Sequence, residues 1–236
     1  MRFEDGSRLK LGREADIEFN QLRFFGDSGM VDTRLRLRKG RVKSEVRDRV
    51  GPDGRYEIQT REVTAAVRGT VFVLEQTVNS SRLEVHDGAV ALKRLDNETR
   101  ISAGDGATVT TTEGVVEKVL PRIEGMSISR TGTSAEAPVF AAWAEDPGHG
   151  FIRYRIARKG LADNSHSYQL LDTGLSDSNR LRLPASAEGV YQLTLQVVDQ
   201  QGFNGVPQQF EFRVDSKAPQ QFELKLSGGA PGKRIL

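Results

Sequence analysis

The chain has 236 residues, enough for two ordinary domains, and neither its 37% hydrophobic nor its 28% charged residues point to disorder. Its 34 basic and 32 acidic residues give a net charge of +2, which excludes a bulk polyanion binder but not a local basic patch. The absence of cysteine excludes disulfides, thiolate nucleophiles and cysteine-based metal sites, and no apolar run approaches the roughly 20 residues of a membrane helix.

Alternation at period two dominates the first half of the chain and predicts β-strands. In the segment 33–38 the leucines face one side, and Arg34, Arg36 and Arg38 face the other. The pattern continues through 42–47 and 56–60, and the unbroken apolar run 71–74 predicts a strand that is buried on both faces. No stretch keeps a helical apolar stripe for more than two turns.

Turn signals recur at short intervals along this half. An Asp-Gly pair between alternating strands favours a tight hairpin, because type I′ turns need positive φ at both central residues. The signals are Asp5-Gly6, Gly26-Asp27, Lys39-Gly40, Asp53-Gly54, Asp87-Gly88, Gly104-Asp105-Gly106 and Glu113-Gly114. We therefore predict a first domain of short strands over residues 1–120.

The character of the sequence changes between Pro121 and Pro138. Residues 121–137 are predicted to be a linker, because 127–137 are small, polar and irregular. Turn residues then separate a second set of strands, which predicts a β-sandwich domain over 138–216, with 217–236 as a linker or the start of a further domain. The predicted strands are 139–143, 151–157, 168–171, 180–183, 190–198 and 210–214.

The segment from Tyr56 to Leu92 resembles the FecR domain. The residues that carry the resemblance are Val67-Arg68-Gly69-Thr70, Phe72-Val73, Val85, Gly88 and Val90. Arg61 departs from the family, which usually has proline there. The chain is similar to bacterial envelope proteins with a LysM module, a FecR domain and immunoglobulin-like repeats, so the resemblance implies a periplasmic or cell-surface location. It also implies a solenoid-like stack of short strands, with a plain antiparallel sandwich as the alternative.

In that family, more FecR sequence and a LysM module precede the strand that carries Asp5-Gly6-Ser7. We therefore expect Met1 to lie inside a longer natural protein, and the segment Met1–Asp5 lacks the apolar stretch of a signal peptide. The peptidoglycan binding of a LysM module and the anti-sigma function of iron-signalling FecR proteins are not carried over, because this chain does not include the segments that they require.

The second half resembles an immunoglobulin-like or fibronectin-like domain. Gly189–Leu193 resembles the start of the penultimate strand with its tyrosine corner, in which the Tyr191 hydroxyl bonds back to the backbone. Residues 199–205 are expected to form the hairpin loop into 210–214, and Trp143 is expected to be the core aromatic of an early strand. The predicted fold class is thus all-β: a FecR-like, solenoid-like domain followed by an immunoglobulin/fibronectin-like sandwich.

The basic strand is the candidate surface for a partner. Arginines 34, 36 and 38 share one face, and further basic residues follow at once. Such a ladder could meet an anionic glycan, lipid headgroups or an acidic protein face. The alternatives are a solvated face that blocks edge aggregation and a face paired with acids on the next strand. The candidate partner-binding residues of this strand are Arg34, Arg36, Arg38, Arg41 and Lys43.

Arg68 is a further candidate, since it could present a charge to a partner beside a glycine that permits close approach. In the alternative interpretation, Gly69 satisfies a turn or bulge and Arg68 pairs with an acid. The residues expected to mark the fold rather than a site are Gly69, Thr70, Phe72, Gly88, Trp143 and Tyr191.

No catalytic, metal or cofactor site is predicted. His86, His149 and His166 are far apart in sequence, and none of the usual hydrolase, phosphate-binding, calcium or zinc motifs is present. Because no aromatic residues are interleaved with the basic ones, nucleic acid is not an expected partner. The sequence favours a non-catalytic extracytoplasmic binding or scaffolding module whose FecR-like domain engages an envelope protein. The alternatives are a binder of peptidoglycan or another anionic glycan, and a β-solenoid enzyme acting on polysaccharides.

Overall fold

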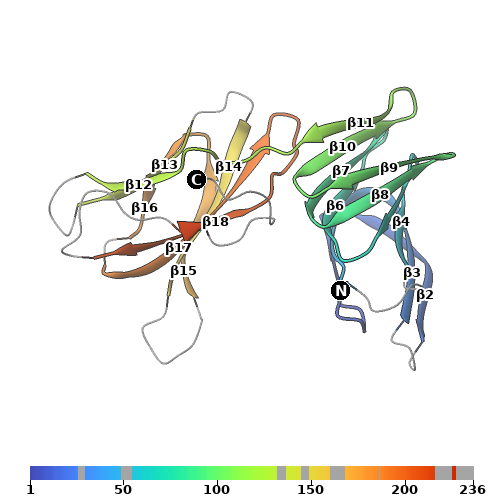
Figure 1. Ribbon diagram of the computed structural model, residues 1–236, viewed down its shortest axis with the longest axis horizontal. Helices are drawn as coiled ribbons and strands as arrows, with labels where there is room; N and C mark the ends of the chain where they lie inside the picture. The colour runs from blue at the N-terminus through green and yellow to red at the C-terminus, as the bar shows by residue number, and fades with distance from the viewer. Residues whose placement is uncertain are drawn as a thin grey trace. The chain divides into compact units, whose positions relative to one another are not determined.

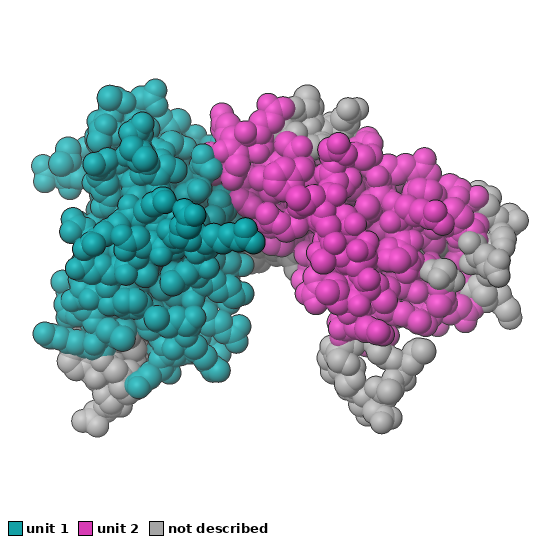
Figure 2. All heavy atoms as spheres, turned by 180° about the vertical axis from the view of Figure 1, so that it is seen from behind, with its two compact units in different colours: residues 1–120 teal, residues 121–236 magenta. Residues whose placement is uncertain are grey.

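The computed structural model describes residues 1–25, 30–48, 55–131, 137–144, 149–159, 168–185, 187–215 and 225–226. The described residues form strands and no helix, which confirms the predicted all-β class. The chain divides into two compact units, residues 1–120 and residues 121–236, which Figure 2 shows in two colours. The division falls at the end of the first predicted domain. The turn signals at Gly26-Asp27 and Asp53-Gly54 lie outside the described residues.

Unit 1 is built from two sheets that share the long strand β3 (Met30–Glu45) (Figure 1). The first half of β3 pairs with β2 (Asp16–Phe25) and β4 (Arg55–Gln59), and its second half pairs with β1 (Arg8–Leu11) and β6 (Val71–Gln76). The strand changes sheet at Gly40, whose φ of +87° favours glycine. The Lys39-Gly40 signal therefore marks a bend within one strand instead of a turn between two.

After β3, the chain forms four hairpins, and successive hairpins join the two sheets in alternation. The β4 sheet consists of β2, the first half of β3, β4, β5 (Thr64–Val67), β8 (Ala89–Arg94) and β9 (Asn97–Ser102). The β6 sheet consists of β1, the second half of β3, β6, β7 (Ser80–Asp87), β10 (Asp105–Thr110) and β11 (Gly114–Val119). Among the described pairings of this unit, β3 with β4 is parallel and the others are antiparallel.

Both sheets of unit 1 bury their inward side chains in one core. Six of these side chains are at most 1% exposed, and they come from both sheets: Leu35, Ile58, Leu92, Phe72, Leu74 and Leu83. The predicted burial of the run 71–74 on both faces is confirmed for its last three residues. Sheets that share a core are a feature of a sandwich, and alternating hairpins are a feature of a solenoid. The choice between those two descriptions stays a prediction.

The chain crosses between the sheets of unit 1 at three glycine-containing corners. Gly69 lies between β5 and β6, Gly88 between β7 and β8, and Gly104 between β9 and β10, with φ values of +59°, +76° and +90°. The prediction of a hairpin at Asp87-Gly88 is wrong, because β7 pairs with β6 and β10 while β8 pairs with β5 and β9. A turn signal reports local backbone geometry and does not determine which strands become neighbours.

Hydrogen bonds join successive corners to one another. Thr70 exchanges two backbone bonds with Val46, at 2.9 and 3.0 Å, and its hydroxyl donates to the Ala89 carbonyl at 2.8 Å. The Ala103 N–H donates to the Gly88 carbonyl at 2.9 Å. The residues that carry the FecR resemblance at 69, 70 and 88 are thus the stacked corners of the fold. This placement favours the structural interpretation of Gly69.

Unit 2 is a sandwich of two antiparallel sheets, as predicted from its strand spacing. One sheet has the order β12 (Ser127–Arg130), β13 (Val139–Ala142) and β16 (Arg180–Leu183). The other has the order β15 (Tyr168–Ser176), β14 (His149–Lys159), β17 (Gly189–Asp199), β18 (Gln208–Val214) and β19 (Lys225–Leu226). Ile128, Trp143 and Leu193 belong to the core that the two sheets share, so Trp143 takes its expected place just after β13.

The structure differs from the predicted linker over 121–137. Ile123 and Ile128 are 6% and 2% exposed in the core of unit 2, and the side chain of Gln208 bonds both the N–H and the carbonyl of Ile123, at 2.6 and 3.1 Å. β12 is an edge strand in which the buried Ile128 and Arg130 alternate with two serines, so part of the predicted linker is a strand of the sandwich. Residues 132–136 lie outside the described part, as do 217–224 and 227–236 of the predicted C-terminal segment.

The predicted tyrosine corner is confirmed, since the Tyr191 hydroxyl donates to the Ala187 carbonyl at 2.6 Å. Tyr191→Phe is expected to lower the free energy of unfolding of unit 2 by about 1 kcal/mol, because the hydrogen bond that the hydroxyl of the buried Tyr191 makes is lost. The measurement is the denaturant midpoint of the fluorescence of Trp143, the chain's one tryptophan. Tyr154→Phe is the control, because its hydroxyl bonds the exposed Asp172. Equal midpoints for the two variants would contradict the prediction.

Candidate partner-binding face

The outward face of the β4 sheet carries most of the charged residues that the sequence singled out. Strand register places Arg34, Glu57, Ala66, Ala91 and Arg100 side by side in one row across five strands. Alternation puts their sequence neighbours into the core, as with Leu35, Ile58, Ala65, Val90 and Ile101. Side chains that are up to 66 residues apart in sequence, from 34 to 100, thus share one surface.

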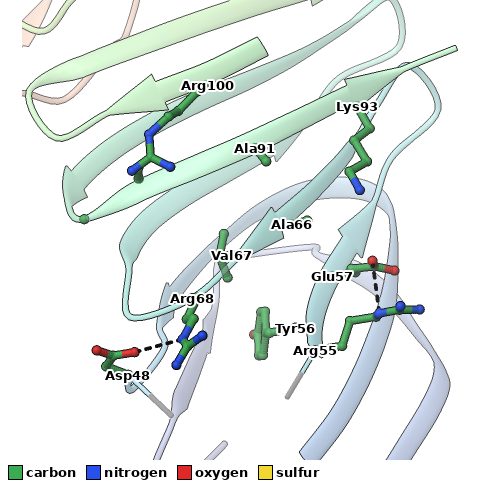
Figure 3. Close-up of a pocket in the computed structure, with 12 residues that line it drawn as sticks. Asp48, Arg55, Tyr56, Glu57, Ala66, Val67, Arg68, Ala91, Lys93 and Arg100 are labelled. Atoms are coloured by element: carbon green, nitrogen blue, oxygen red, sulfur yellow. Dashed lines mark hydrogen bonds and ion pairs between the residues drawn. The ribbon is translucent and has the colours of Figure 1, made fainter. Parts of the chain in front are cut away.

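This face is hollowed where its side chains are smallest. Ala66, Ala89 and Ala91 form the floor together with Val67, and the recess has a volume of about 780 Å³. We call it the alanine hollow. Its described lining residues are Asp48, Arg55, Tyr56, Glu57, Ala66, Val67, Arg68, Gly88, Ala89, Ala91, Lys93 and Arg100. Figure 3 shows Arg100 and Lys93 flanking Ala91, with Arg68 and Arg55 toward the opposite end, past Val67.

Cations outnumber carboxylates around the alanine hollow, four to two among the described lining residues. Arg55 lies 3.7 Å from Glu57, and Arg68 lies 3.2 Å from Asp48 (Figure 3). Within the described part of the chain, no ion pair is recorded for Arg100. The Arg68–Asp48 pair is exposed on both sides, so it contributes little to stability and its charges remain available to a ligand.

The first three arginines of the predicted basic strand lie on this same face. Arg34 is 3.3 Å from Asp32, and Arg38 is 2.7 Å from Glu18 of β2. Arg36 is exposed, and no ion pair is recorded for it among the described residues. Pairing with acids on the next strand, one of the alternatives that the sequence left open, describes Arg38 and also Arg34, which is 4.0 Å from Glu57 of β4, but not Arg36.

The structure separates Arg41 and Lys43 from this group. Both follow Gly40, so they lie on the half of β3 that belongs to the β6 sheet. Arg41 bonds both carboxylate oxygens of Glu84, at 2.7 and 2.8 Å, and lies 3.4 Å from Glu75. Lys43 is 3.8 Å from Glu45. The predicted ladder of basic residues is therefore divided between two surfaces. On the second surface, the charges of Arg41 and Lys43 are largely neutralised by neighbouring carboxylates.

Arg68 lies at a corner of the fold and also at the rim of the alanine hollow. Its position is compatible with both the structural and the partner-binding interpretation. Phe72 is fully buried in the core of unit 1. Arg55, Lys93 and Arg100 also line the alanine hollow and were not predicted from the sequence. Ala89-x-Ala91-x-Lys93 could have revealed the recess, because alternate residues of β8 face outward and the first two are small.

Outside the alanine hollow, the described residues include fewer groups that could form a functional site. No group of three or more His, Asp or Glu side chains suited to a metal occurs among them. His86 is 7% exposed and lies 3.6 Å from the buried Glu84. The side chain of His149, and all of His166, lie outside the described residues. In unit 2, burial and a hydrogen bond to a carboxylate raise the pKa of Tyr154 and of Tyr168.

Residues 1–91 match the model of a family described as FecR protein. The chain contains a FecR domain. This domain covers β1 to β7 and reaches into β8, so the floor of the alanine hollow belongs to it. No curated protein matches the chain. The part of the chain that the structure describes holds no helix able to cross a membrane.

Solved structures show weaker similarity. A "putative anti-sigma factor" from Parabacteroides distasonis is 19% identical with a TM-score of 0.41, and the match covers 50% of this chain and 54% of that protein. The extracellular domain of a "putative one component system" from B. thetaiotaomicron is 10% identical with a TM-score of 0.27, and the match covers 85% of this chain and 37% of that one. Because the TM-scores are low, neither likeness supports a function for the FecR domain described here.

Proposed function

We propose that this chain is a non-catalytic module that works outside the cytoplasm, where its FecR domain binds a protein partner in envelope sensing or assembly. The alanine hollow is the observation that carries the proposal. A recess on the face of a sheet, with cations at its rim, can accept part of another molecule and orient it by charge. The family match over residues 1–91 supports the envelope role.

The lining of the alanine hollow suits binding better than catalysis. Its two carboxylates, Asp48 and Glu57, each face an arginine. The described lining residues include no histidine, serine or threonine, and their one hydroxyl, that of Tyr56, is buried and hydrogen-bonded to Ser44 at 3.1 Å. Charged groups around an apolar floor are the usual composition of a surface that recognises a partner.

A binder of peptidoglycan or another anionic glycan is the second candidate. Arg36 and Arg100 favour it, because both are exposed cations without a recorded ion pair in the described part of the chain and could meet sugar carboxylates. The floor of the hollow favours protein instead. Among its described lining residues the one aromatic is Tyr56, which is 1% exposed and offers no open ring on which a sugar could stack.

A cross-linking pull-down of the tagged chain from solubilised bacterial envelope tests the proposal. We expect one dominant protein, and we expect the variant Arg55→Ala/Lys93→Ala/Arg100→Ala to lose most of it, because three rim cations are removed. Arg213→Ala is the control, since it removes an exposed arginine of β18 in unit 2. Recovery of glycan alone, or of no envelope component, would count against a protein-binding module.

A further inference from the structure

We infer that the alanine hollow accepts an extended acidic segment of a polypeptide, with an aliphatic side chain over the alanines and carboxylates at the rim. The inference rests on the proposed function, because it names the part of the partner that is bound. Three observations carry it: the size of the floor, the placement of the charges and the kind of side chains that form the surface.

The floor has the dimensions of a short extended peptide. The row Glu57–Ala66–Ala91–Arg100 crosses from β4 to β9 in three strand steps. Since neighbouring strands lie roughly 4.8 Å apart, the row spans about 14 Å, the length of about four extended residues. Ala66 and Ala91 are register partners and end at Cβ, so the centre of the row leaves space above the sheet for a ligand side chain.

The charges lie at the ends of this floor. Arg100 and Lys93 flank Ala91, and Arg68 and Arg55 lie toward the other end (Figure 3). An extended segment with carboxylates near both ends would place an acid within reach of each cation group. Arginine suits this role, because its planar guanidinium bonds a carboxylate through two parallel N–H donors.

The intramolecular acids of the rim can give way to such a ligand. The side chains of Arg68 and Asp48 are 56% and 81% exposed, and those of Lys93 and Glu98 are 51% and 57% exposed. Ion pairs with this exposure are held weakly, so an incoming carboxylate can replace them at little cost. The hollow therefore favours a ligand of negative charge even though part of its rim is already paired.

The surface chemistry favours polypeptide over the other anionic polymers. Nucleic acid and sugar rings are commonly held by open aromatic faces, and the described lining residues offer none, since Tyr56 is buried. Alanine and valine methyl groups instead suit contact with an aliphatic side chain. The combination of an aliphatic centre and acidic ends is available in a peptide.

The test is fluorescence anisotropy of the full chain with a labelled peptide Glu-Asp-Leu-Val-Asp-Glu, beside a Lys-Lys-Leu-Val-Lys-Lys peptide and an oligogalacturonate. We expect the acidic peptide to bind and the basic one not to bind. Arg100→Glu should weaken binding about tenfold, because a charge-assisted contact is replaced by repulsion. Ala91→Leu should weaken it comparably by filling the floor. Arg213→Glu, the same charge change on unit 2, should leave binding unchanged.

Each other outcome overturns the inference. If Ala91→Leu leaves affinity intact, the peptide is held by surface charge outside the hollow. If oligogalacturonate binds with the same dependence on Arg100 and Ala91, the ligand class is a glycan. If the acidic peptide does not bind while the envelope pull-down still captures one protein, the partner uses another surface and the proposed function stands. If that pull-down also captures nothing, the proposed function fails with it.

Discussion

Gly88→Ala is expected to lower the free energy of unfolding of unit 1 by about 3 kcal/mol. Two costs combine at this corner. The φ of +76° lies in the left-handed region, which residues with a Cβ avoid. An added Cβ would also overlap the carbonyl oxygen of Gly69 and lie 3.1 Å from the Thr70 hydroxyl. The neighbouring corner cannot move away easily, because Thr70 is hydrogen-bonded to Val46 and to Ala89.

Gly104→Ala is the matched control for this prediction. Its φ is +90°, but nothing lies within 4 Å of the position that its Cβ would take. It should therefore show the conformational cost alone, about 1 kcal/mol. The readout is separable, because Trp143 in unit 2 is the one tryptophan and its fluorescence does not follow unit 1. Unfolding is followed by far-ultraviolet circular dichroism and by tryptophan fluorescence. The transition of unit 1 is the one that appears in the circular dichroism but not in the fluorescence. Equal shifts for the two variants would mean that the corners do not stack tightly.

Arg41→Ala is expected to destabilise unit 1 by about 3 kcal/mol. The side chain of Glu84 is 1% exposed, and Arg41 donates to both of its carboxylate oxygens. Removing the arginine leaves a buried carboxylate without its main counter-charge, and the penalty for burying a charge greatly exceeds the value of a surface pair. The measurement is the same circular dichroism transition.

Two further variants separate this effect from a general loss of positive charge. Lys39→Ala removes a cation only two residues away from Arg41. The side chains of Lys39 and its partner Glu14 are 67% and 80% exposed, so the free energy of unfolding should change by no more than about 0.5 kcal/mol. Arg41→Met/Glu84→Gln removes both charges and should recover most of the stability that Arg41→Ala loses. If the double variant is as unstable as Arg41→Ala, the shape of the arginine matters more than its charge.

Both predictions concern contacts between segments that are distant in the sequence. Gly88 and Gly69 belong to different corners, and Arg41 and Glu84 belong to different strands. The FecR resemblance identified Gly69, Thr70 and Gly88 as residues that mark the fold. The structure supplies the reason, which is that each corner forms part of the packing surface of the next.

The sequence alone determined the features that depend on residues close together in the chain, such as alternating strands and short-range hydrogen bonds. Strands at 139–142, 180–183 and 208–214 agree with the predicted segments, because alternation with burial on one face is visible in a few residues. The tyrosine corner was predictable for the same reason, since Tyr191 and Ala187 are four residues apart. The basic residues at 34, 36 and 38 were correctly placed on one face of one strand.

Only the tertiary structure decided which strands become neighbours. The signal at Asp87-Gly88 is the same for a hairpin and for a corner, because turn chemistry is local while pairing depends on the partners that each strand finds elsewhere. One positive-φ glycine, Gly40, divides the basic strand between two sheets and sends Arg41 to Glu84. The alanine hollow exists because Ala66 and Ala91, 25 residues apart, are register partners, and long-range register follows from burying the whole core at once.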